Sequence, residues 1–210
     1  MKWLLIPGWS TDTEIFSHYL DLLNENTTYS WGFSTDSQAS KDEETLSFLN
    51  EDYSVLCYSM GILKALELSI QNPPKKIISI CGFPSFCNSD KRRTMQINLM
   101  IRGLKKNHQK VITDFRKTAG LSDVENKTWN VNNLEKGLVN LRDSDFSDSS
   151  ETRKLDILLI EGIQDAIVPN NISQRLLTGP GNRQSISVEG GHGIIESQIN
   201  EIRQILKDNI

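Results

Sequence analysis

Residues 55–61, VLCYSMG, join an apolar, strand-like run to a helix-like run, and Ser59 lies at the junction. The apolar residues that follow, over 62–69, have the spacing of an amphipathic helix. A strand–turn–helix corner strains the serine backbone and needs small residues two positions away. Gly61 meets this need after Ser59, and Cys57 takes the place of a glycine before it. The pattern predicts a nucleophilic serine, and the simpler alternative is a serine that caps the helix.

The rest of the chain repeats this alternation of strands and helices. Short apolar runs occur at residues 3–6, 53–57, 77–81, 155–160 and 184–188. Helical spacing of apolar residues follows at 16–23, 62–69 and 195–206. Runs this apolar are typical of strands that are covered on both faces. The sequence therefore predicts an α/β fold, with a mostly parallel sheet flanked by helices.

One long segment interrupts the alternation. Between residues 87 and 150 there are two helical patterns, at 95–115 and 134–141, and no convincing strand. The polar tract at 143–154 then leads back to the next strand. With 210 residues in all, the chain is long enough for one main core. We expect one core domain formed by residues 1–86 and 151–210, with residues 87–150 as a helical lid inserted into it.

Two other strand ends carry residues that suit a serine nucleophile. Asp165 follows the run at 155–160, and His192 lies in a glycine-rich loop after the last strand. In this order, Ser59, Asp165 and His192 match a hydrolase triad in which histidine takes the serine proton and aspartate orients the histidine. Glu161 is the alternative acid. The other two histidines are expected on the surface or in packing.

The loop after the first strand, IPGWS, is expected to complete the site. A developing oxyanion needs two backbone N–H donors, and we predict that Trp9 and Met60 supply them. Trp9, Phe83 and Phe86 are expected to line an apolar substrate channel, although each is also a normal core residue. Metal-ligand spacing and a glycine-rich phosphate loop are both missing from the sequence. We therefore expect neither a metal nor another cofactor.

The charge is distributed unevenly. The chain carries a net charge of −4, yet residues 87–120 hold nine basic residues against two acidic ones. Such a run is either a solvated helix face or a surface that binds an acidic partner. The three cysteines have no metal spacing and suit reduced thiols. The apolar run at 3–6 is too short for a signal peptide or a membrane span. We expect a cytoplasmic monomer without a membrane or nucleic-acid partner.

Four motifs together resemble the α/β-hydrolase superfamily: LLIPGW at 4–9, CYSMG at 57–61, GIQDAIVP at 162–169 and GGHGII at 190–195. Three further segments resemble, more narrowly, the pimeloyl-acyl-carrier-protein methyl ester carboxylesterases of biotin synthesis. These are ICGFPSFC at 80–87, the helical stretch at 99–120 and LEKGLVNLRDSD at 134–145. The first loop departs from that family's usual His-Gly-Trp-Gly, because Pro7 and Ser10 replace its outer residues.

The narrower resemblance implies an activity and a partner. Members of that family hydrolyse a methyl ester at the far end of a pimeloyl chain whose other end is thioesterified to acyl carrier protein. They hold this acidic carrier through basic lid residues, for which the candidates here are Arg92, Arg93, Arg102, Lys105 and Lys106. Two alternatives stay open: an acyl thioesterase or general short-chain carboxylesterase, and a non-catalytic protein that binds an acidic partner.

Overall fold

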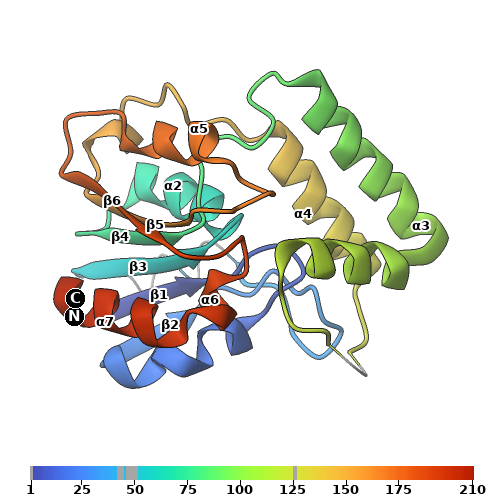
Figure 1. Cartoon of the computed structure of the whole chain (residues 1–210), viewed down its shortest axis with the longest axis horizontal. Helices are drawn as coiled ribbons and strands as arrows, with labels where there is room; N and C mark the ends of the chain where they lie inside the picture. Colours follow the sequence, from blue (N-terminus) through green and yellow to red (C-terminus); the bar gives the residue numbers. More distant parts are fainter. Residues whose placement is uncertain (1, 42–44, 46–51, 125–126) are drawn as a thin grey trace.

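The computed structural model describes residues 2–41, 45, 52–124 and 127–210. Its centre is a six-stranded sheet in the order β2-β1-β3-β4-β5-β6, in which all neighbouring strands are parallel (Figure 1). The strands are β1 (Lys2–Ile6), β2 (Glu25–Thr28), β3 (Tyr53–Tyr58), β4 (Ile77–Ile80), β5 (Ile157–Gly162) and β6 (Arg183–Val188). The predicted parallel sheet is confirmed.

The central strands are covered on both faces, which explains their nearly continuous apolar sequence. Every residue of β3, β4 and β5 is buried, as expected for parallel strands between two helical layers. The predicted boundaries of all three strands shift by one or two residues, and β3 extends to Tyr58 rather than ending at Cys57. β4 ends at Ile80 because Cys81 turns into the left-handed region with a φ of 53°, and β5 begins at Ile157 rather than at residue 155.

β2 was not predicted from the sequence. It contains the polar residues ENTT, pairs only with β1 at the edge of the sheet, and has no buried residue. An edge strand of this kind has neither the apolar run of a buried strand nor a regular apolar alternation. Its backbone pairing with β1 is therefore the only feature that marks it as a strand.

Helices cover both faces of the sheet (Figure 1). On one face lie α2 (Gly61–Gln71), α5 (Asn170–Ser173) and the 3₁₀ helix η3 (Gln174–Leu177). On the other lie the 3₁₀ helix η1 (Thr13–Leu22), α6 (Ile194–Ser197) and α7 (Ile199–Asn209). A short 3₁₀ turn, η2 (Thr152–Lys154), precedes β5. The helix predicted over 16–23 is thus present as a 3₁₀ helix that begins at Thr13.

Between β4 and β5, the chain forms two helices beyond one end of the sheet: α3 (Lys91–Ala119) and α4 (Val131–Asp143) (Figure 1). α3 is broken at Asn107, which has a φ of −156° and a ψ of 84°. The Asn107 side chain then accepts a hydrogen bond from Lys110 N at 3.0 Å, and so caps the second half of the helix. None of the helices in the described ranges is long and apolar enough to cross a membrane.

Candidate active site

Ser59 occupies the turn between β3 and α2, in the strained conformation that the sequence predicts. Its φ is 51°, a left-handed value that costs a non-glycine residue energy. Ser59 N donates to Ile80 O of the neighbouring strand at 2.8 Å, which holds the turn in place. A Cβ at Gly61 would lie 2.2 Å from Ile6 O. Only glycine therefore lets α2 begin this close to the end of β1.

The structure brings Ser59, His192 and Asp165 together. His192 Nε2 lies 2.8 Å from Ser59 Oγ, and His192 Nδ1 lies 2.8 Å from Asp165 Oδ2. All three residues are buried, with His192 only 2% exposed. The other carboxylate oxygen, Asp165 Oδ1, accepts hydrogen bonds from Ile167 N and Val168 N, each at 2.8 Å. The Asp165 carboxylate is therefore fixed by the loop that follows β5.

The alternative acid, Glu161, points to different partners. Its carboxylate accepts a hydrogen bond from Ser173 Oγ at 2.7 Å and another from Gln174 Nε2. Both partners belong to the helical segment after β5, and neither is a residue of the Ser59–His192 cluster. His18 is exposed on η1 and His108 is half-buried on α3. The structure thus places Asp165, and not Glu161, beside His192.

Two residues that the sequence did not single out hold the His192 backbone. Tyr58 Oη donates to His192 O at 3.0 Å, and Cys81 Sγ donates to the same oxygen at 3.5 Å. Burial raises the pKa of the Tyr58 hydroxyl and of the Cys81 thiol well above their ordinary values. Both groups therefore keep their protons and act as donors. These contacts span more than 100 residues of sequence, so no local pattern reveals them.

The two predicted oxyanion donors lie beside Ser59. A Cβ at Gly8 would be 3.0 Å from Ser59 Cβ, so the loop that carries Trp9 packs directly against the serine. Met60 is the residue after Ser59, at the start of α2. Within the described part of the chain, neither the Trp9 nor the Met60 backbone N–H donates to an acceptor. Both remain available to an atom bound at Ser59.

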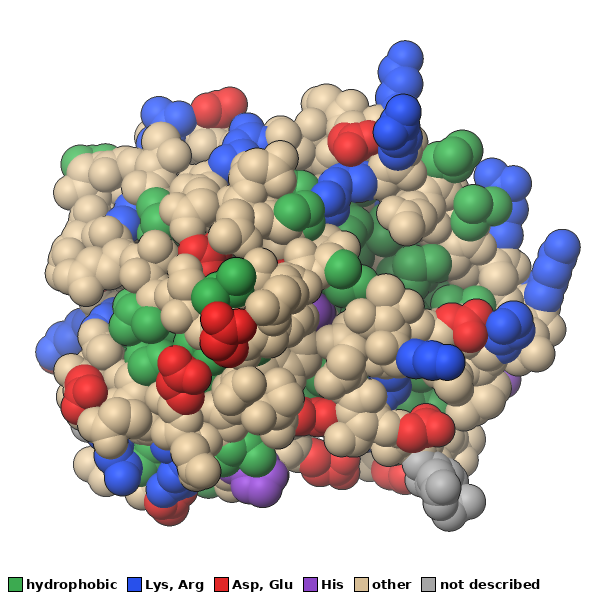
Figure 2. All heavy atoms as spheres, in the orientation of Figure 1, with side chains coloured by type: hydrophobic (Ala, Val, Ile, Leu, Met, Phe, Trp, Pro, Cys, Tyr) green, Lys and Arg blue, Asp and Glu red, His purple; other side chains and the backbone are tan. Residues whose placement is uncertain are grey.

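A cavity of about 610 Å³ opens above Ser59, between the sheet and α3 and α4. Trp9, Phe83 and Phe86 all lie in its wall, as the sequence predicts. The Trp9 indole is fixed by a hydrogen bond from Nε1 to Leu134 O at 3.0 Å. Figure 2 shows hydrophobic side chains in the hollow beside α3, with Lys and Arg side chains projecting from the outer side of that helix. The cavity suits an apolar chain.

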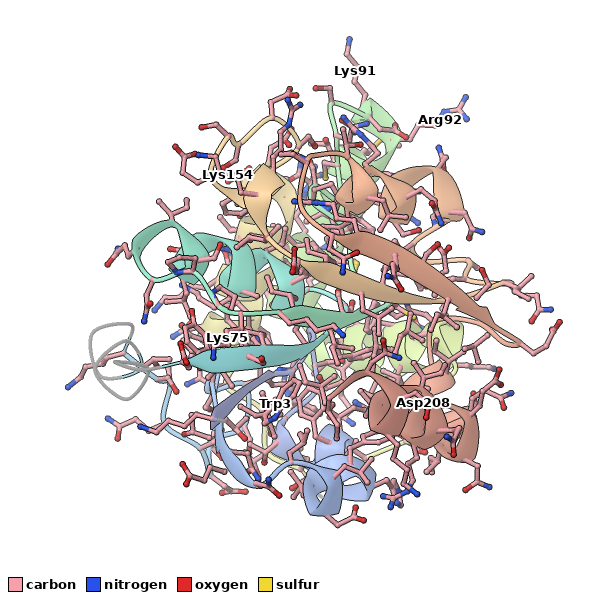
Figure 3. The ribbon with its side chains drawn as sticks, turned by 90° about the vertical axis from the view of Figure 1, so that its left-hand side faces the viewer. Trp3, Lys75, Lys91, Arg92, Lys154 and Asp208 are labelled. Carbon is pink, nitrogen blue, oxygen red and sulfur yellow. The ribbon has the colours of Figure 1, made fainter. Side chains whose placement is uncertain are left out.

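The five basic residues predicted to bind a carrier differ in their surroundings. Arg92, Arg102, Lys105 and Lys106 are exposed, and Lys91 and Arg92 extend away from the ribbon at the start of α3 (Figure 3). Lys105 Nζ pairs with Glu135 at 3.0 Å. Arg93 is half-buried in the cavity wall, where it donates to Ile167 O at 3.3 Å and lies over the Phe86 ring. Arg93 thus lines the cavity while part of its side chain stays exposed, and carrier binding by these five residues stays a prediction.

Cys81, Asp165 and His192 also place potential metal-ligating atoms within 4.8 Å of one another, and are the one such group among the residues described. Their polar atoms already serve other partners. His192 Nδ1 contacts Asp165, and the Cys81 thiol donates to His192 O. A coordinating thiol must lose its proton, whereas burial raises the Cys81 pKa. We interpret the group as a hydrogen-bond network. The expected absence of a metal stays a prediction.

Several solved structures are similar to this chain over almost its whole length. The esterase EaEST from Exiguobacterium antarcticum has a TM-score of 0.83 at 16% identity, over 99% of this chain and 91% of that protein. MenH from S. aureus has a TM-score of 0.76 at 15% identity, with 99% and 94% covered. A bromoperoxidase from Bacillus anthracis has a TM-score of 0.75 at 18% identity, with 98% and 90% covered.

The sequence comparisons add no narrower family. No family model matches the chain, and no curated protein is significantly similar to it. The similar structures bear the names of different enzymes, so their likeness identifies the fold and leaves the resemblance to pimeloyl ester carboxylesterases a prediction. The six-stranded parallel sheet flanked by helices, together with these matches, shows that the chain has the α/β-hydrolase fold.

Proposed function

We propose that this protein is a serine carboxylesterase that works through an acyl-Ser59 intermediate. The observation that supports this most is the pair of 2.8 Å contacts from His192, one to Ser59 Oγ and one to Asp165 Oδ2. The Asp165 carboxylate can only accept a hydrogen bond, so His192 Nδ1, which faces it, must be the donor. In neutral His192 the single ring proton is therefore on Nδ1. His192 Nε2 is then free to accept the Ser59 proton.

In the first half of the reaction, Ser59 Oγ attacks the carbonyl carbon of the ester while its proton passes to His192 Nε2. The carbonyl oxygen becomes an oxyanion beside the free N–H groups of Trp9 and Met60. The N-terminus of α2 points at the same place and favours negative charge there. When the tetrahedral intermediate collapses, the carbon–oxygen bond to the alcohol breaks. His192 returns the proton to that alcohol, which leaves.

In the second half, water attacks the acyl-Ser59 carbonyl and gives a proton to His192. The second tetrahedral intermediate uses the same two backbone donors. Its collapse breaks the bond to Ser59 Oγ, which regains its proton from His192, and the carboxylic acid is released. Water replaces the alcohol on the acyl group, and the enzyme returns to its initial state without a cofactor.

For the substrate, we propose the methyl ester of a pimeloyl chain carried on acyl carrier protein. The sequence resemblance supports this choice, and two features of the structure agree with it. The wall of the cavity above Ser59 is mainly apolar and can hold an extended chain. The outer face of α3 presents Arg92, Arg102 and Lys106 to solvent, and an acidic carrier is attracted to such a surface.

Docking on α3 also accounts for selectivity between two bonds. The thioester that joins the chain to the carrier is more reactive than the methyl ester, yet it has to survive. If the carrier stays outside and the chain enters the cavity, only the distal ester reaches Ser59. Positioning of this kind contributes large rate factors, so it can outweigh the difference in intrinsic reactivity.

The test is to incubate the protein with methyl pimeloyl acyl carrier protein and to measure the mass of the carrier. We expect the loss of one methylene unit, with the thioester retained, and no change with the Ser59→Ala variant. Loss of the whole acyl chain would instead identify a thioesterase. Turnover of small esters alone would identify a general carboxylesterase. Binding without turnover of any ester would leave the non-catalytic binding protein.

A further inference from the structure

We propose that Arg116, in the second half of α3, is a positioning residue that holds the Trp9 loop (residues 8–11) in the conformation needed to bind the oxyanion. This inference rests on the proposed esterase activity. The sequence places Arg116 in the basic run of residues 87–120 and suggests a solvated surface charge. The structure instead buries it, with 5% of the residue exposed.

Arg116 reaches two loops with its three donor nitrogens. Nη1 donates to Ser10 O at 2.7 Å, and both Nε and Nη2 donate to Ser122 O, at 2.8 and 2.6 Å. Hydrogen bonds from a charged donor are stronger than those between neutral groups. Glu196 Oε1 lies 4.0 Å from Nη2. The guanidinium therefore interacts most closely with backbone carbonyls, one of them in the Trp9 loop.

The Trp9 loop is held in a strained form. Ser10 is fully buried with a φ of 57°, a left-handed value that non-glycine residues avoid, and its Oγ has no hydrogen-bond partner in the described structure. Thr11 closes the loop by donating to Gly8 O from both N and Oγ1. A strained conformation persists only when its surroundings impose it. The bond from Arg116 to Ser10 O acts directly at the strained residue.

The end of α3 also contacts the loop that carries His192. A Cβ at Gly193 would lie 2.3 Å from Gly120 O, and Ser122 N donates to Glu196 Oε2 at 2.6 Å. The segment from Arg116 to Ser122 therefore touches the Trp9 loop on one side and the chain after His192 on the other. Arg116 and the segment after it connect the inserted helix α3 with the Trp9 loop and with the chain after His192.

This arrangement predicts a specific kinetic effect. The Trp9 N–H is needed most when the oxyanion forms, so displacing it weakens the transition state more than the bound substrate. Removing an oxyanion donor completely costs about 10²–10³-fold in kcat. Loosening the Trp9 loop displaces that donor without removing it. We therefore expect Arg116→Met to lower kcat by roughly 10- to 100-fold and to leave KM nearly unchanged.

The experiment compares Arg116→Met and Arg116→Lys with Lys117→Met, which removes the adjacent exposed charge. Hydrolysis of p-nitrophenyl butyrate gives kcat and KM, and inhibition by a trifluoromethyl ketone measures affinity for the tetrahedral state. For Arg116→Met we expect this affinity to fall by the same factor as kcat. Arg116→Lys, whose single ammonium cannot hold both carbonyls in the same way, should show a smaller parallel loss. Lys117→Met should match the wild type.

The proposal is overturned if Arg116→Met matches Lys117→Met, or if kcat falls while the affinity for the trifluoromethyl ketone does not. Should Arg116→Met fail to fold by circular dichroism, Arg116→Lys decides alone: a parallel loss supports the role, and wild-type values overturn it. A wild-type protein that hydrolyses no ester would instead refute the proposed function.

Discussion

Gly61 offers a sharp test of how closely the fold and the site are connected. In Gly61→Ala the new Cβ would lie 2.2 Å from Ile6 O, whereas an ordinary carbon–oxygen contact is roughly 3.3 Å. α2 and the end of β1 must therefore separate by about 1 Å. Overpacking of this kind costs about 1–3 kcal/mol of stability. Because Ser59 and the Trp9 loop lie on the two separating segments, a displacement of this size also costs up to about 10²-fold in activity.

Gly181→Ala is the matched control. Its Cβ would lie 2.2 Å from Leu155 O, so the steric overlap is equal, but Gly181 precedes β6 at the end of the sheet opposite Ser59. Thermal unfolding should show both variants destabilised, by about 2–4 °C for each kcal/mol. Ester hydrolysis, measured at a temperature where both are folded, should show a large loss of kcat in Gly61→Ala alone. An equal loss in both variants, or full kcat in Gly61→Ala, would refute this reasoning.

Three further outcomes are expected. The double variant Arg92→Glu, Arg102→Glu should raise KM for carrier-bound substrate and spare small esters, whereas Lys154→Glu, Lys207→Glu should do neither; an equal loss on both substrates would remove the docking surface. Asp165→Asn should keep the fold by circular dichroism and lower kcat by about 10⁴-fold, so near-normal turnover would contradict the role of Asp165. Burial raises the pKa of the Cys57 thiol to about 12 and also raises those of the other two cysteines. Because only thiolates react readily, the native protein should resist iodoacetamide at neutral pH and react fully in urea, and rapid alkylation of the native protein would show that the thiols are accessible.

The parts of the fold that follow local rules could be predicted. The apolar runs predicted β3, β4 and β5, because a parallel strand that is buried on both faces has a nearly continuous apolar sequence. The rule that sites form at the carboxyl ends of parallel strands then brought Ser59, Asp165 and His192 to one place. Their positions after successive strands were enough to expect them together, whereas the 2.8 Å distances between their polar atoms come from the structure.

The parts that depend on tertiary contacts could not be predicted. β2 is polar and lies at the edge of the sheet, so its sequence carries no strand pattern. Arg116 belongs to a basic run, and nothing local distinguishes a buried arginine from its exposed neighbours. Arg93 was proposed as a carrier-binding residue, and the sequence did not reveal that it also lies against Phe86 and the loop after Asp165. Each of these placements is decided by segments far away in the sequence.

The most direct measurement of the central claim is fluorophosphonate labelling, with the modified peptide identified by mass spectrometry. Because Asp165 orients His192 and His192 takes the Ser59 proton, Ser59 should be the one labelled serine. His192→Ala should slow the labelling of Ser59 by orders of magnitude while the circular dichroism spectrum stays unchanged. An unlabelled Ser59 in the folded wild-type protein, or a label that forms equally fast in His192→Ala, would contradict the account.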